Sequence, residues 1–129
     1  MGEVIELTLP AVPELMSLAR FTAATLGARA EFSMDEIEDL RLGANELCLS
    51  MLNGARGSAM HLRFSREGDT VEISCELESS EIGAWSGTGL DSEWSLRILD
   101  AVVTEHGRDL KGLRGRAWLR KRRGASTLP

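Results

Sequence analysis

The spacing of apolar residues predicts a long amphipathic helix between Ser33 and Asn53. Apolar side chains recur there at steps of three and four, as expected for one face of a helix. Ser33 followed by Glu36 is a capping-box pattern, because each side chain can bond a free amide of the first turn. Gly54 and Gly57 are expected to end the helix. The predicted core-facing stripe contains Ile37, Leu40, Ala44, Leu47, Cys48 and Met51.

Shorter segments on both sides of this helix show helical or alternating patterns. A spacing of two, with apolar residues on one side only, predicts strands that bury one face. Gly27 and Gly107 are expected to end helices. The predicted elements are a strand at 4–9, a helix at 12–27, a hairpin of 60–65 and 71–78 with a turn at 67–69, a helix at 93–106, a short strand at 110–113 and a strand at 115–121.

The order of these elements predicts an α+β fold with two layers. Strands and helices are segregated along the chain in the order β-α-α-β-β-loop-α-β-β, which favours a sheet covered by helices. The short link at 28–32 makes the first two helices spatial neighbours. Segment 79–91 has three glycines and no sustained period, so we expect a functional or mobile loop. We expect one domain over residues 1–129, with an ordered part at about 4–123 and a tail at 124–129.

Composition places the chain among ordinary globular proteins. The apolar fraction is 43%, the charged fraction is 27% and the net charge is −5. The sequence shows no signal-peptide pattern and no apolar run long enough to span a bilayer, so we expect a soluble cytoplasmic protein with no membrane partner. Cys48 and Cys75 lie in apolar patterns outside any metal-binding motif, which predicts buried free thiols. His61 and His106, expected in a strand and at a helix end, accompany no nucleophile elbow, which excludes a serine hydrolase.

Positive charge gathers in the last third of the chain, from Arg108 to Arg123. Such a region can attract nucleic acid or an acidic partner. It can equally be a solvated edge strand whose charges prevent strand pairing with other molecules. We favour the edge strand and expect no direct nucleic-acid contact, since only Trp118 in this region offers an aromatic surface for stacking on bases.

A second row of residues runs along another face of the long predicted helix. Gly43, Glu46, Ser50 and Asn53 are spaced by three and four, so they line up over about three turns. A carboxylate, a hydroxyl and an amide in one row can form a site, and they can also form a solvated surface. Periodicity alone does not decide between the two.

Five segments of the chain form a recognisable series: LARFTAATL, MDEIEDLRLGANELCLS, the hairpin, the glycine-bearing loop and SLRILDAVV. Together they resemble the bacterial anti-sigma factor and serine-protein kinase family, which has the histidine-kinase-like ATPase (Bergerat) fold. The resemblance covers residues 4–123 in matching order, and its best segment runs from Met34 to Glu46. It implies a two-layer α/β sandwich with a mixed, mostly antiparallel sheet and about three helices on one face.

The resemblance also implies where a nucleotide would bind. The family helix carries Glu-x-x-x-Asn, in which the carboxylate is the general base for the phosphoryl acceptor and the amide holds magnesium. Glu46 matches the base, but Ser50 stands in the place of the asparagine. A hydroxyl can hold magnesium with a shorter reach than an amide. Asn53, one turn further on, is a weak substitute for the missing amide.

The other nucleotide motifs of the family are altered in this chain. Glu81 and Gly83 are the nearest match to the Asp-x-Gly-x-Gly motif that binds adenine, and Trp85 replaces its last glycine. Gly87 and Gly89 represent the phosphate lid. The next helix presents bulky Trp94 where the family has a glycine-rich turn, and we expect both tryptophans to fill part of the pocket.

Joint changes in several nucleotide motifs favour a regulator over an efficient kinase. The resemblance implies an anti-sigma-like protein that binds a sigma factor and an anti-anti-sigma partner, commonly as a homodimer. Arg20 matches a family position that reaches the sigma factor, and Glu14 and Phe21 lie near it. No cofactor is then required. The alternative is an active serine kinase that uses ATP and magnesium, and a third reading is a nucleic-acid binder that uses the basic end.

Overall fold

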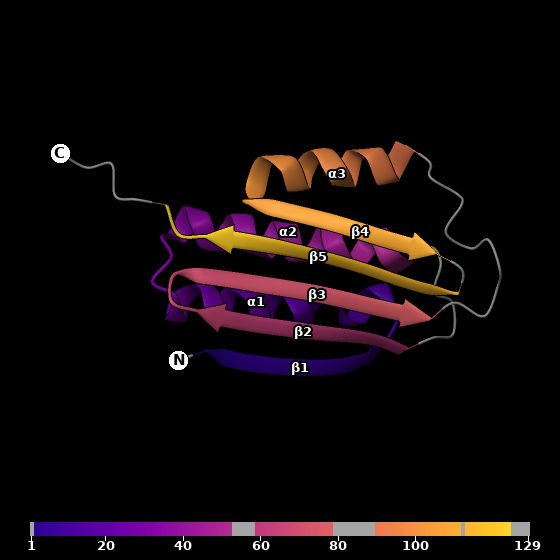
Figure 1. Cartoon of the computed structure of the whole chain (residues 1–129), viewed down its shortest axis with the longest axis horizontal. Helices are drawn as coiled ribbons and strands as arrows, with labels where there is room; N and C mark the ends of the chain where they lie inside the picture. Colours follow the sequence, from indigo (N-terminus) through magenta and orange to yellow (C-terminus); the bar gives the residue numbers. More distant parts are fainter. Residues whose placement is uncertain (1, 53–58, 79–89, 112, 125–129) are drawn as a thin grey trace.

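A five-stranded antiparallel sheet forms one layer of the protein, and three α-helices form the other (Figure 1). The computed structural model describes residues 2–52, 59–78, 90–111 and 113–124. The strands lie in the order β1-β2-β3-β5-β4. The predicted α+β sandwich is confirmed, although all four strand pairings described are antiparallel where the resemblance implied a mixed sheet.

The bounds of the elements follow the predicted order with shifts at several ends. The strands are β1 (Glu3–Pro10), β2 (Ala59–Glu67), β3 (Thr70–Glu78), β4 (Glu105–Lys111) and β5 (Arg114–Arg122). The helices are a 3-10 turn (Pro13–Leu15), α1 (Met16–Arg29), α2 (Met34–Leu52) and α3 (Leu90–Val102).

Helix α2 lies between α1 and α3 and packs on β3 and β5. Its capping box is confirmed, because the Ser33 amide donates to Glu36 Oε1 at 2.9 Å and the Glu36 amide donates to Ser33 Oγ at 3.2 Å. Burial of the predicted stripe is confirmed too, with Ile37 half-buried at its start. The fully buried members are Leu40, Ala44, Leu47, Cys48 and Met51.

Helix α1 ends two residues later than predicted, and Gly27 is not its cap. The chain leaves the helix through Glu31, whose φ of +61° is the left-handed conformation usually taken by glycine. The amide of Phe32 then bonds the carbonyl of Gly27 at 3.0 Å, and the amide of Glu31 bonds that of Ala28 at 3.1 Å. This is a Schellman motif with glutamate in the glycine position. Gly27 lies within the helix, where a Cβ would approach Leu40 to 3.2 Å.

The hairpin of β2 and β3 is confirmed with its predicted turn. Glu67 pairs with Thr70, so Gly68 and Asp69 form a two-residue connection. Gly68 has a φ of +61°, which a tight hairpin turn requires. The inward residues of both strands are buried and form the centre of the core.

The region after α3 differs most from the prediction. The helix ends at Val102, and His106 and Gly107 belong to β4 instead of the helix end. Gly107 makes room for Trp118 of β5, because a Cβ there would lie 2.9 Å from the indole Nε1. His106 Nε2 bonds Asp100 Oδ1 at 2.6 Å, while its buried Nδ1 has no hydrogen-bond partner among the described residues.

The basic strand β5 is internal, so the prediction that it forms the edge of the sheet is wrong. It lies between β3 and β4, and β4 is at the edge. Three of its four arginines are paired across the outer face with glutamates of β3. The described pairs are Arg114–Glu78 at 3.1 Å, Arg116–Glu76 at 3.7 Å and Arg120–Glu72 at 3.0 Å, and Arg120 also reaches Glu105 at 3.1 Å.

Residues just after β5 form hydrogen bonds with the segment that connects α1 to α2 and with the first turn of α2. Arg123 Nη1 donates to the carbonyl oxygen of Ala30 at 2.9 Å and approaches Glu31 Oε2 at 3.3 Å. The amide of Gly124 donates to Glu36 Oε2 at 2.6 Å. The capping carboxylate of α2 therefore binds two amides, one from its own turn and one from beyond β5.

We expect Glu3 to contribute an acid-sensitive part of the stability. Hydrogen bonds from Arg29 and from Arg66, each at 2.6 Å, lower the pKa of Glu3 from 4.5 to about 2. Since the folded pKa lies below the unfolded one, the stabilisation is complete above about pH 4.5 and is lost as the pH falls toward 2. Glu3→Gln should therefore flatten the fall in unfolding free energy across this range, measured by urea denaturation.

The matched control for this experiment is Glu6→Gln on the same strand. Glu6 lies on the outer face, 3.8 Å from Arg63 Nε, in a looser pair. The control should keep the acid slope of the wild type. Equal slopes for Glu3→Gln and the wild type would contradict the assignment.

Candidate nucleotide site and partner surface

Glu46 is held by a hydrogen bond from helix α3. Ser95 Oγ donates to Glu46 Oε2 at 2.8 Å, although the two residues are 49 positions apart in the sequence. Ser95 is only 6% exposed, and Glu46 is half-buried. The contact joins the candidate base to the helix that follows segment 79–89. Sequence spacing offered no signal for it, because it depends on how α3 packs beside α2.

Ser50 uses its hydroxyl proton within its own helix. Its Oγ donates to the carbonyl oxygen of Leu47 at 2.7 Å, a common bond for serine inside a helix. The hydroxyl oxygen keeps its lone pairs, so a weak ligand position remains. Asparagine would project an amide oxygen further from the helix axis.

The described residues do not assemble a metal site around Glu46 and Ser50. No group of three or more His, Cys, Asp or Glu side chains that could hold a metal occurs in the described ranges. Magnesium in nucleotide sites is usually held by one or two protein oxygens together with phosphates. The Ser50 hydroxyl reaches only a short distance from the helix, and the Glu46 carboxylate already accepts a hydrogen bond from Ser95. These two side chains are therefore poorly suited to hold magnesium.

Gly43 belongs to a packing contact and not to the polar surface of Glu46 and Ser50. A Cβ at Gly43 would lie 2.9 Å from Val103 Cγ1 and 3.3 Å from Leu119 Cδ2. The glycine lets the end of α3 approach α2 closely. The predicted polar row is therefore divided between a buried helix crossing and a half-buried polar pair.

Most of the other predicted nucleotide residues lie outside the described ranges. These are Asn53, Glu81, Gly83, Trp85, Gly87 and Gly89. Trp94 is described and is 64% exposed, so it does not fill a pocket as we expected.

The predicted partner residues lie on and just before α1. Arg20 Nη1 donates to Asn45 Oδ1 of α2 at 2.7 Å, and Phe21 is 74% exposed. Glu14 is exposed in the 3-10 turn. Arg20 also lines an open hollow of about 470 Å³ on the helix layer, together with Glu38, Asp39, Arg41, Leu42 and Asn45. Arg20 thus lines the hollow beside α2, while Phe21, the next residue along α1, is largely exposed to solvent.

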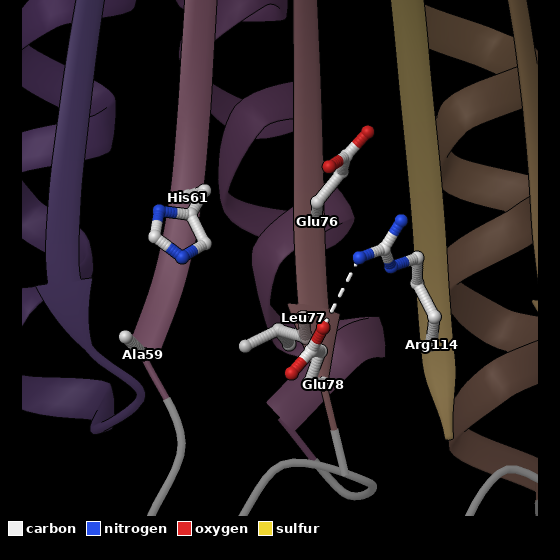
Figure 2. Close-up of a pocket in the computed structure, with 6 residues that line it drawn as sticks. All are labelled: Ala59, His61, Glu76, Leu77, Glu78 and Arg114. Carbon is white, nitrogen blue, oxygen red and sulfur yellow. Dashed lines mark hydrogen bonds and ion pairs between the residues drawn. The ribbon is translucent and has the colours of Figure 1, made fainter.

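A second hollow lies on the outer face of the sheet (Figure 2). It measures about 310 Å³ and is lined by Ala59, His61, Glu76, Leu77, Glu78 and Arg114. Figure 2 shows Arg114 directed at Glu78, the pair that closes one side of the hollow. His61 Nδ1 is 3.1 Å from Thr8 Oγ1 across the β1–β2 pairing. These side chains are satisfied by neighbouring strands and require no ligand.

The two cysteines are free and buried, as predicted. Cys48 of α2 faces Cys75 of β3, and the contact between the thiols together with burial raises the pKa of Cys75. A thiol that resists ionisation is a poor nucleophile. The pair therefore acts as core packing.

Comparison with known proteins gives the family of the chain. The two-layer antiparallel architecture is consistent with the Bergerat ATPase type. No family model matches the chain. The chain is 44% identical over 108 residues to "Serine-protein kinase RsbW" of Listeria monocytogenes serotype 4a (strain HCC23), covering 72% of this chain and 67% of that protein. The chain belongs to the bacterial anti-sigma factor and serine-protein kinase family.

Other relatives carry the same name and match a shorter part. The protein from Halalkalibacterium halodurans is 33% identical over 73 residues, with 55% of this chain and 45% of that protein covered. The protein from Bacillus subtilis (strain 168) is 29% identical over 76 residues, with 56% and 48% covered. The chain thus spans about half the length of these curated relatives. Within the described ranges, none of the helices is long and apolar enough to cross a membrane.

We expect Gly43→Ala to destabilise the protein by about 1 kcal/mol. Overpacking against Val103 costs roughly 1–3 kcal/mol, and the better helix propensity of alanine offsets about 1 kcal/mol of that. Urea denaturation measures the change. Glu38→Ala, at an exposed position of the same helix, is the control and should stay within about 0.5 kcal/mol. A raised stability in Gly43→Ala would show that α3 is not packed as described.

Proposed function

We propose that the chain is an anti-sigma-type regulator that acts by binding proteins, with nucleotide binding weak or lost. Its partners are a sigma factor and an anti-anti-sigma protein, and it works in the cytoplasm as a homodimer. The observation that carries the proposal is the surface around Phe21, where a large aromatic side chain is 74% exposed beside an ordered arginine. Aromatic and arginine side chains are the residue types that most often dominate binding energy at protein interfaces.

The surroundings of Phe21 support a protein-binding role. Leu18 on α1 and Leu42 on α2 are both more than 40% exposed, so apolar area is available on both helices. Arg20 lines the same hollow as Leu42, and its bond to Asn45 at 2.7 Å orients the guanidinium. A pre-oriented arginine loses less conformational freedom on binding.

The contacts of Ser50 and Glu46 support the proposal that nucleotide binding is weak or lost. Ser50 replaces the magnesium-binding amide of the family motif, and its proton is already committed to Leu47. Glu46 is bonded to Ser95. Efficient phosphoryl transfer depends on exact positioning of metal and base, so both contacts favour a site with little transfer activity.

A second candidate function is an active serine-protein kinase that phosphorylates an anti-anti-sigma protein with ATP. One observation favours it: the carboxylate at the general-base position, Glu46, is retained. The relatives named above are also called serine-protein kinases. Under this candidate, Ser50 would hold magnesium through its hydroxyl oxygen.

We expect Phe21→Ala to weaken partner binding by about ten- to a hundredfold while leaving stability unchanged. The side chain is mostly in solvent, so its removal does not disturb the core. The measurement is co-purification from the native host, followed by titration of the recovered sigma factor. Arg20→Ala should have a similar effect.

Met34→Ala is the matched control for the partner experiment. Met34 is 76% exposed, but it lies at the start of α2, away from the Arg20–Asn45 contact. It should bind the partner like the wild type. Equal binding by Phe21→Ala and the wild type would overturn the proposed surface, and recovery of nucleic acid alone would favour a nucleic-acid binder.

We expect calorimetry with magnesium and ATP to show no binding in the micromolar range for the wild type. The reason is the joint loss of the magnesium ligand and the free carboxylate. Micromolar binding that disappears in Glu46→Ala or Ser50→Ala would instead establish the kinase candidate. Glu38→Ala is the control, because this carboxylate is exposed on the same helix and pairs with Arg41.

A further inference from the structure

Helix α3 is held differently at its two ends. At its C-terminal end, Leu99 is buried, Val103 packs against Gly43, and Lys121 Nζ donates to the carbonyl oxygen of Val102 at 2.8 Å. Between residues 93 and 98, only Ser95 is buried; the other five side chains, Glu93, Trp94, Leu96, Arg97 and Ile98, are exposed or half-buried. The C-terminal end is thus fixed by packing, and the N-terminal half depends more on one polar contact.

That polar contact is the hydrogen bond between Ser95 and Glu46. Among the described residues, Ser95 is the one polar residue that is buried. Its hydroxyl therefore needs a hydrogen-bond partner inside the protein. The Glu46 carboxylate provides it at 2.8 Å. A bond from a hydroxyl to a carboxylate is stronger than a neutral one, and it is stronger still where water is excluded.

We propose that this bond is a latch that holds the N-terminal half of α3 over the candidate base. The inference rests on Glu46 as the general base, an assignment that belongs to the kinase candidate given under the proposed function. A serine hydroxyl on a phosphoryl-acceptor protein would make the same bond to the same carboxylate oxygen. Ser95 therefore acts as a built-in competitor, and an acceptor hydroxyl reaches Glu46 Oε2 only after Ser95 leaves. The resting chain is closed to its acceptor by one of its own serines.

The first experiment measures access to Glu46 without any nucleotide. A water-soluble carbodiimide with ethanolamine labels carboxylates, and peptide mass spectrometry follows Glu46 relative to exposed Glu38 in the same sample. Ser95→Ala should speed labelling of Glu46 about tenfold, the factor expected when a charge-assisted hydrogen bond is lost. Ser95→Thr keeps a hydroxyl and should label like the wild type.

A control variant separates the latch from a general loss of stability. Thr22→Ala also removes a helix hydroxyl, one that donates to the carbonyl oxygen of Leu18 at 2.8 Å on α1. It should leave labelling of Glu46 unchanged. Equal labelling rates in Ser95→Ala and the wild type would overturn the proposal.

Hydrogen exchange gives a second readout. The double variant in this experiment distinguishes one shared bond from two separate packing contributions. The amides of residues 93–98 should exchange about tenfold faster in Ser95→Ala and in Glu46→Ala, and the double variant should be no faster than either. The amides near Leu99 should stay protected. Additive effects, or faster exchange along the whole helix, would contradict a latch. Neither readout involves ATP, so a failure here is distinct from a failure of the proposed function in calorimetry.

Discussion

Burial of helix α2 between the sheet and the two other helices is the constraint on which the rest of the structure depends. Its stripe of apolar side chains packs on β3 and β5, and burying one such side chain stabilises a fold by roughly 1.5–3 kcal/mol. Because the helix cannot turn without losing this burial, the directions of its other side chains are fixed. Asn45 faces Arg20 on α1, and the next residue, Glu46, faces Ser95 on α3. The proposed partner surface and the candidate base are therefore adjacent positions on one rigid element.

Local chemistry made parts of the fold predictable from sequence. The capping box at Ser33, the apolar stripe of α2 and the alternating hairpin each depend on residues close together in the chain, and all three are confirmed. Predictions that used a glycine to mark the end of a helix were less reliable. Gly27 and Gly107 were expected to end helices, but each serves a close approach of another element. The actual end of α1 uses Glu31 at a positive φ, which composition does not reveal.

The site was less predictable than the fold because its contacts join distant segments. Glu46 was identified through family resemblance, but its partner Ser95 is brought to it only by the crossing of α2 and α3. The basic C-terminal region shows the same limit. Its positive charge could be read from the sequence, while its neutralisation by β3 glutamates depends on the register of β3 and β5. Three arginines of this region, Arg114, Arg116 and Arg120, are thus paired with carboxylates of the neighbouring strand.

The tie from Arg123 and Gly124 to the start of α2 has a consequence for how the protein is made. The second carboxylate oxygen of Glu36 gains its partner only when the amide of Gly124, 88 positions further along the chain, reaches it. A ribosome releases the chain from its N-terminus, so α2 emerges long before that amide exists. During synthesis the first turn of the helix relies on the reciprocal bonds between Ser33 and Glu36. The helix that carries the candidate base thus gains its contact with Gly124 only after β5 has been made.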